Sequence, residues 1–246
     1  MNDLSLSATT RAYAESNMQH QGVLPEYAMK EEKLPFTVKL VDNDDELQKA
    51  VNIRHAAYQR HVPAFAEKLK SPEPIDKEEG VIILLAESKL DGSPIGTMRL
   101  QTNIGKPLPL EQSVTLPDWL SGRTLGEATR LGVSGSQAGR LVTAALFKAG
   151  LHYCFQTGIE WIVVAGRSPI DRQYERLMFD EVFPGLGYVP LKHANNMPHR
   201  IMSIEIGQIE PRWHKANHPL YNFFFRTFHE DIRVNNEFLV RNALEA

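Results

Sequence analysis

One stretch, from Thr124 to Thr157, limits the possible fold more than any other part of the chain. It predicts a strand over 124–133, a loop of small residues from Ser134 to Gly139, and an amphipathic helix that begins near Arg140. Such a loop exposes backbone N–H groups beside the positive end of the helix dipole, which suits a phosphate or pyrophosphate. An ordinary tight strand-to-helix connection fits the spacing as well. The loop matches neither the P-loop pattern nor the dinucleotide fingerprint.

Composition narrows the class of protein. The 246 residues are 42% hydrophobic and 23% charged, which is ordinary for a globular chain with a substantial core. A net charge of −3 gives no reason to expect a nucleic-acid partner. We expect no transmembrane segment and no signal peptide, because no long apolar run is present and residues 1–33 are polar. The single Cys154 predicts a buried filler in a cytoplasmic protein.

The periodicity and turn signals predict alternating strands and helices. Strands are expected at 36–41, 81–87, 95–102, 124–133, 161–165, 188–191 and 200–206. Helices are expected at 45–59, 64–69, from about 140 onward, 168–179 and 219–228. We therefore expect an α/β (α+β) fold with three layers, α/β/α, around a mixed, mostly antiparallel sheet of about seven strands. The predicted organisation is a flexible N-terminal extension (1–34), a single domain (35–232) and a C-terminal tail (233–246).

Several motifs in this order resemble a known superfamily. Arg54-x-x-x-Tyr58 resembles the Arg-x-x-x-Phe of acyl-homoserine lactone (autoinducer) synthases, Gly96-Thr-Met-Arg99-Leu resembles their third strand, and Glu127-Ala-Thr-Arg130 resembles their fourth. The segment from Pro219, Pro-Leu-Tyr-Asn-Phe-Phe-Phe, looks like the C-terminal helix of the related N-acyl amino acid synthases. The resemblance spans about residues 36–232 and implies a GNAT-like acyltransferase. The acidic cluster around Asp76 departs from the autoinducer-synthase spacing, so the N-acyl amino acid synthase branch looks closer.

The resemblance implies transfer of a fatty acyl group, of long chain, from an acyl carrier protein thioester to the amine of an amino acid. It implies Glu127 as the base for the amine, directly or through water, and Tyr174 as a donor to the leaving thiolate. Arg130 could orient either Glu127 or the phosphate of the carrier. The family also has a bulge in this strand, which would let Glu127 and Arg130 meet. The substrate-binding candidates are Arg54, Tyr58, Asp76 and Arg99. Because an Arg near a core needs a partner, we expect Arg99 to pair with Asp76 or Glu127.

The expected cofactor is an acyl-phosphopantetheine, carried by acyl carrier protein or by coenzyme A, with no metal. The candidate backbone donors for it are Val133, Ser134, Gly135, Gln137, Ala138, Gly139 and Arg140. The histidines of 193–199 and 214–218 have poor spacing for metal ligands. A tunnel for a long acyl chain could be lined by Phe147, Leu151, Trp161, Val163 and Phe223 to Phe225, which serve equally well as ordinary core.

Two other functions remain open from the sequence. One is a small-molecule N-acetyltransferase that uses acetyl-coenzyme A. The other is an acyltransferase-like protein that binds a lipid or a partner without turnover. The sequence does not give the oligomeric state or the identity of the amine.

Overall fold

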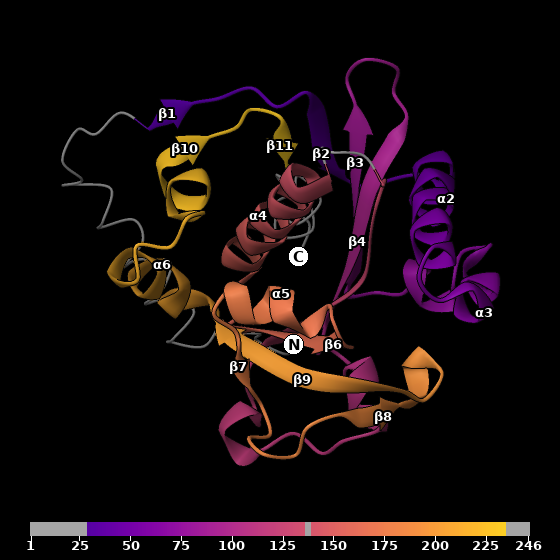
Figure 1. The fold of residues 1–246 in the computed structure, drawn as a ribbon, viewed down its shortest axis with the longest axis vertical. Coiled ribbons are helices and arrows are strands. Elements are labelled where there is room, and N and C mark those ends of the chain that lie inside the picture. Colours follow the sequence, from indigo (N-terminus) through magenta and orange to yellow (C-terminus); the bar gives the residue numbers. More distant parts are fainter. Residues whose placement is uncertain (1–28, 136–138, 235–246) are drawn as a thin grey trace, which may run out of the picture.

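The computed structural model describes residues 29–135 and 139–234. Its centre is a mixed sheet of nine strands in the order β11-β2-β3-β4-β5-β6-β9-β7, with β8 paired to β9 (Figure 1). Its strands are β2 (Phe36–Leu40), β3 (Val81–Ser88), β4 (Pro94–Thr102), β5 (Leu125–Val133), β6 (Trp161–Gly166), β7 (Asp180–Glu181), β8 (Val189–Leu191), β9 (Met197–Glu205) and β11 (Ile232–Arg233). The predicted class is confirmed, and the predicted count of about seven strands was too low because it missed the short β7 and β11.

The pairing within the sheet is mostly antiparallel, as the sequence predicts. Two neighbours are parallel: β5 with β6, and β11 with β2. The β5–β6 pair is parallel because the long helix α4 (Gly139–Thr157) carries the chain back across the sheet between them.

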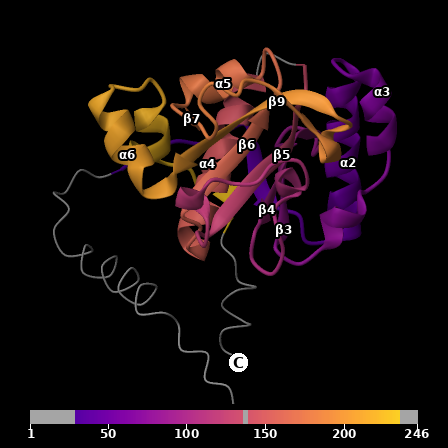
Figure 2. The same cartoon turned by 90° about the horizontal axis from the view of Figure 1, so that it is seen from below.

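Helices cover both faces of the sheet (Figure 2). Helix α2 (Asp44–Gln59) and the short α3 (Pro63–Ala66) lie on one side, and α4 lies on the other. The predicted start of α2 is confirmed, because the Asn43 side chain accepts a hydrogen bond from the Glu46 amide at 2.9 Å. Leu47, Ala50 and Val51 then pack against the sheet. These layers give the expected α/β/α plan.

Helix α4 supplies the largest part of the core. Val142, Ala145 and Leu146 are fully buried against the sheet. The apolar stripe expected on this helix is confirmed at Ala144, Ala145 and Leu151, which are buried, and is wrong at its two ends, Leu141 and Phe155, which are exposed. Cys154 is buried and unbridged, and burial raises the pKa of its thiol, which agrees with its predicted role as filler.

Two predicted helices are corrected. The helix expected over 168–179 is the shorter α5 (Asp171–Arg176), which follows a turn that begins at Arg167. The helix expected over 219–228 is only a π-helical turn, Asn222–Arg226. A helix that the sequence did not predict, α6 (Ile206–Lys215), precedes it. Ile206, Ile209 and Trp213 form the buried stripe of α6 at helical spacing, and the internal Pro211 obscured that signal.

The two ends of the described chain lie together. Strands β1 (Lys30–Glu31) and β10 (Thr227–Phe228) pair in a separate parallel ribbon, and Leu34 is buried with its amide 2.8 Å from Asp231 Oδ2. The proposed domain boundaries at 34 and 232 stay predictions, since most of the extension and tail lies outside the described residues. Within the described residues, no helix has the length and apolarity needed to cross a membrane.

Candidate active site

The site begins where two central strands separate. Pairing between β5 and β6 ends at Ala128 and Val164, although β5 continues to Val133. The edge of β5 from Thr129 onward therefore opens a cleft toward the end of β6. A pocket of about 260 Å³ occupies this cleft.

A β-bulge sits at the mouth of the cleft. The β4–β5 register shifts between the pairs Arg99–Thr129 and Thr97–Gly132, so one extra residue is accommodated on β5. Arg130 takes a left-handed backbone conformation there, with φ of 55°. The expected bulge is thus present. It does not bring Glu127 and Arg130 into contact; instead Arg130 binds Glu73 through two 2.7 Å hydrogen bonds.

Arg130 belongs to a buried cluster of three guanidiniums and two carboxylates. Asp76 Oδ1 accepts from Arg99 at 2.9 Å, which is one of the two pairings that the sequence predicted. Asp76 Oδ2 accepts from Arg54 at 2.6 Å, and Glu73 bridges all three arginines. Burial opposes the charges of Glu73 and Asp76, but the hydrogen bonds and charges of the arginines outweigh it and hold both carboxyl pKa values below their ordinary range.

The pocket wall does not include three of the predicted substrate-binding residues, Arg54, Arg99 and Asp76, which belong to this cluster. Arg54 and Arg99 share Glu73 with Arg130, whose guanidinium also lies 5.1 Å from the centre of the Phe65 ring. Tyr58 is the one predicted substrate residue that lines the pocket directly.

Glu127 is fully buried on β5, one residue before the strands separate. Burial raises its pKa to about 7, against the Leu110 amide, which donates to Oε2 at 3.0 Å, and the charges of Arg99 and Arg130. Such a carboxyl can exchange a proton near neutral pH. It does not reach the pocket itself: His193 stands between them, with Nε2 3.3 Å from Glu127 Oε1.

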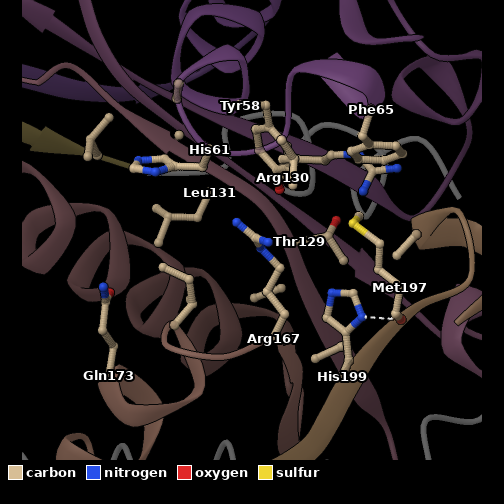
Figure 3. Close-up of a pocket in the computed structure, with 18 of the residues that line it drawn as sticks. Tyr58, His61, Phe65, Thr129, Arg130, Leu131, Arg167, Gln173, Met197 and His199 are labelled. Atoms are coloured by element: carbon tan, nitrogen blue, oxygen red, sulfur yellow. Dashed lines mark hydrogen bonds between the residues drawn. The ribbon is translucent and has the colours of Figure 1, made fainter. Parts of the chain in front are cut away.

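Side chains from several helices and strands line the pocket (Figure 3). Toward α2 and β9 it presents Tyr58, Phe65, Met197 and His199, and toward α4 and α5 it presents Thr143, Ile170, Gln173 and Tyr174. Arg167, just after β6, points into the middle of the pocket. Among the described residues none forms an ion pair with it, in contrast to Arg130.

Tyr174, the candidate proton donor, lines the α5 side of the pocket. Its ring packs on Phe147 and Phe179, and burial, with Tyr58 nearby, raises the pKa of its hydroxyl, which stays protonated. None of the residues suggested for an acyl tunnel lines this pocket, and Leu151 and Val163 are fully packed core residues.

The candidate backbone donors are only partly available. The Ser134 amide already donates to the Ile95 carbonyl at 2.9 Å, so it is not available to bind the cofactor. Val133 alternates with it, so its amide faces away from β4 and toward the cleft. Gly135 and Arg140 flank the loop and are exposed, and Gly139 begins α4. Gln137 and Ala138 lie outside the described residues.

Sequence reasoning missed three residues of this pocket as functional candidates: Arg167, His193 and His199. Arg167 and His193 lie at chain reversals, where no periodicity identifies a side chain's direction. The Asn195-Asn196 pair, both with left-handed φ, was the available turn signal beside His193. Over the described ranges, no set of three or more His, Cys, Asp or Glu side chains is arranged to hold a metal ion.

Solved structures share this architecture. FeeM, an N-acyl amino acid synthase from uncultured soil microbes, gives a TM-score of 0.54 at 17% identity, over 76% of this chain and 96% of that one. BjaI, a CoA-dependent acyl-homoserine lactone synthase solved with SAM and isopentyl-CoA, gives 0.50 at 15% identity over 85% and 99%. The acyl-homoserine lactone synthase LasI gives 0.50 at 16% identity over 70% and 90%. The chain therefore shares the fold of these synthases.

The sequence comparisons make the class more specific. The model of the family N-acyl amino acid synthase FeeM matches residues 49–195, more than half of the chain, and the chain belongs to this family. A curated relative, the mycothiol acetyltransferase of Propionibacterium freudenreichii subsp. shermanii, is 27% identical over 159 residues. That match covers 63% of this chain and 47% of the relative, so the chain spans about half the length of the curated protein it matches.

Proposed function

We propose that this acyltransferase moves an acyl group from a phosphopantetheine thioester to the α-amine of an amino acid. The observation that carries the proposal is Arg167, which forms no ion pair with any described residue and lies in a pocket that His193 separates from Glu127. A guanidinium without a counter-charge in a half-enclosed pocket favours an anion, and a planar carboxylate fits its fork of donors. An acceptor held by its carboxylate at Arg167 would present its amine to the Glu127 side of the same cleft.

Other residues of the cleft would serve the remaining tasks of the reaction. The pantetheine arm would lie along the open edge of β5, where the Val133 amide faces the cleft. Glu127 and its neighbours would take the proton from the ammonium group. Tyr174, on the α5 wall, would return a proton to the thiolate that leaves. The acyl chain would then pass between Ile170, Gln173 and Thr143.

Acyl carrier protein is the proposed carrier of the thioester. Arg60 and Arg140 are both exposed beside the loop at the mouth of the cleft, and carrier proteins present an acidic surface. If this is right, kcat/KM for acyl carrier protein falls as the salt concentration rises. If kcat/KM is equal for the same acyl group on coenzyme A and does not depend on salt, coenzyme A rather than acyl carrier protein is the carrier.

A second candidate is an N-acetyltransferase that uses acetyl-coenzyme A. The pocket favours it in one respect, because about 260 Å³ is small beside the roughly 300–1,000 Å³ of many ligand sites. A series of thioesters from two to sixteen carbons separates the candidates. A maximum at eight carbons or more supports the fatty acyl donor, and turnover confined to the acetyl thioester supports the second candidate.

The acceptor is tested with matched pairs of amines, such as tyrosine and tyramine, that differ only in the carboxylate. We expect wild-type kcat/KM to favour the amino acid by roughly 10- to 100-fold, the range that one charge-assisted pair supplies. Arg167→Gln should remove that preference, and Arg172→Gln, an exposed change on α5, should keep it. Equal use of both amines by the wild-type enzyme would exclude Arg167 as a carboxylate anchor.

A further inference from the structure

We propose that His193 is the residue that touches the acceptor amine and takes its proton, with Glu127 as the charge that stabilises the protonated imidazole. The inference rests on the proposed amide-forming reaction and assigns its base. It starts from a geometric difficulty: Glu127 has no exposed surface and is separated from the pocket. An amine in the pocket therefore meets another group first.

That group is the His193 imidazole. Its side chain lines the pocket and keeps 11% of its surface exposed, whereas Glu127 keeps none. Nε2 lies 3.3 Å from Glu127 Oε1, and Oε1 has no aligned hydrogen-bond donor among the described residues. A buried carboxylate oxygen left in that condition costs free energy. A proton on His193 Nε2 would remove this cost, since it creates the missing donor.

The backbone of His193 is held from several sides. Arg130 Nη2 donates to the His193 carbonyl at 3.3 Å, and the preceding Lys192 amide donates to Ser113 Oγ at 2.9 Å. The following Asn195 has a left-handed φ of 58° and accepts from Lys68 Nζ at 2.8 Å. Three elements distant in sequence thus fix one short turn. Arg130 and its ion cluster act on the base through this turn, and Arg130 is a positioning residue.

The charges around the pair come from every neighbouring strand. Arg99 on β4 and Arg130 on β5 face both groups, His199 on β9 faces the imidazole, and Glu111 faces Glu127. Burial and the positive neighbours lower the pKa of His193 to about 4, against the Pro109 carbonyl, which favours the protonated ring. The imidazole is therefore neutral at pH 7 and has a lone pair to accept a proton.

The proton step is balanced as follows. We place the proton of the neutral imidazole on Nδ1, which has no hydrogen-bond partner among the described residues, so that Nε2 keeps the lone pair that accepts the proton. An N–H bond of the acceptor ammonium breaks and an Nε2–H bond forms. The imidazolium and the Glu127 carboxylate, 3.3 Å apart, then form an ion pair. The freed amine lone pair bonds to the thioester carbonyl carbon, and the C–S bond breaks with its electron pair on sulfur. The thiolate takes up the second proton that the new amide nitrogen loses, and the proton on His193 leaves to solvent.

The test combines kinetics with chemical rescue. His193→Ala should lower kcat by roughly 10²- to 10⁴-fold and leave the KM of the thioester within about twofold, the loss expected for a positioned base. Added imidazole should restore at least tenfold of that loss. The matched control is His214→Ala, an exposed histidine on α6, which should keep wild-type turnover. Melting temperatures of the variants check that they fold.

Retention of more than a third of the wild-type kcat by His193→Ala, or failure of imidazole to rescue a folded variant, would overturn the role of His193 while the proposed reaction stands. A wild-type protein that makes no amide from any thioester would instead overturn the proposed reaction. A double-mutant cycle then decides the pairing alone. The losses in kcat caused by His193→Ala and by Glu127→Gln should be less than additive in the double variant, because both remove the same proton transfer, and fully additive losses contradict the proposal.

Discussion

Replacing Asp76 by Asn should destabilise the protein strongly. The Asp76 side chain has no exposed surface and accepts four hydrogen bonds: two on Oδ1 from Arg54 and Arg99, and two on Oδ2 from Arg54 and the Glu73 amide. An Asn amide keeps one oxygen, so two of these bonds are lost, at least one of them from a guanidinium. Three arginines would then share only the Glu73 carboxylate.

Breaking a buried ion pair from one side costs about 3–5 kcal/mol. For a chain of this size each kcal/mol lowers Tm by roughly 2–4 °C, so Asp76→Asn should lower it by roughly 6–20 °C. Differential scanning calorimetry at pH 7 measures this. Asp180→Asn is the matched control, because its partner Arg212 lies at the surface and its own side chain is 69% exposed. That variant should change Tm by no more than about 2 °C.

The same cluster predicts a pH dependence. The folded pKa values of Asp76 and Glu73 are lowered, so the unfolded chain binds more protons than the native chain between the folded and the ordinary carboxyl values. Stability should therefore fall as the pH falls through that acidic window, and less steeply in Asp76→Asn. A variant with wild-type Tm and wild-type acid sensitivity would refute the reasoning, because it would mean that the arginines need no counter-charge here.

Three further predictions concern other parts of the fold. Lys148→Met should lower the free energy of unfolding in urea by about 3 kcal/mol. Lys148 Nζ is buried and donates to the Phe223 and Thr227 carbonyls at 2.7 and 2.6 Å, and both carbonyls would lose this donor. An unchanged unfolding midpoint would argue against that role. Gly132→Ala should lower the free energy of unfolding by about 1–3 kcal/mol in the same assay. The added Cβ would lie 3.0 Å from Ala57 Cβ and 3.2 Å from the Arg54 Cα of helix α2. A variant as stable as the wild type would show that α2 can shift. Tyr174→Phe should lower kcat by about tenfold or more with an unchanged Tm, and a kcat within twofold of wild type would exclude Tyr174 as the thiolate's proton donor.

The sequence predicted most of the fold because the signals are local. The alternation in 95–102 and the apolar periodicity of 45–59 each depend on neighbours in the chain, and both elements form where expected. The errors fall where tertiary packing decides. The face of α4 that is buried depends on the sheet residues that the helix contacts. The segment 219–228 forms only the π-helical turn Asn222–Arg226, and in this turn the Phe223 carbonyl accepts a hydrogen bond from the distant Lys148.

The site was harder to predict than the fold. Glu127, Arg130 and Tyr174 were identified from motif spacing, and all three lie at or beside the pocket. The partners were not predictable, because Glu73 and His193 are separated from Arg130 by 57 and 63 positions and meet it only once the bulge has turned its side chain. Local sequence contains no information about such distant pairings.

The central claim is most directly tested by mass spectrometry of the product that purified enzyme forms from an isotopically labelled acyl thioester and a mixture of amino acids. The account predicts a labelled N-acyl amino acid from the wild-type enzyme, and a rate lower by roughly 10²-fold or more from Glu127→Gln. A labelled product without an amide bond to an amino acid, or equal rates from the two proteins, would contradict it.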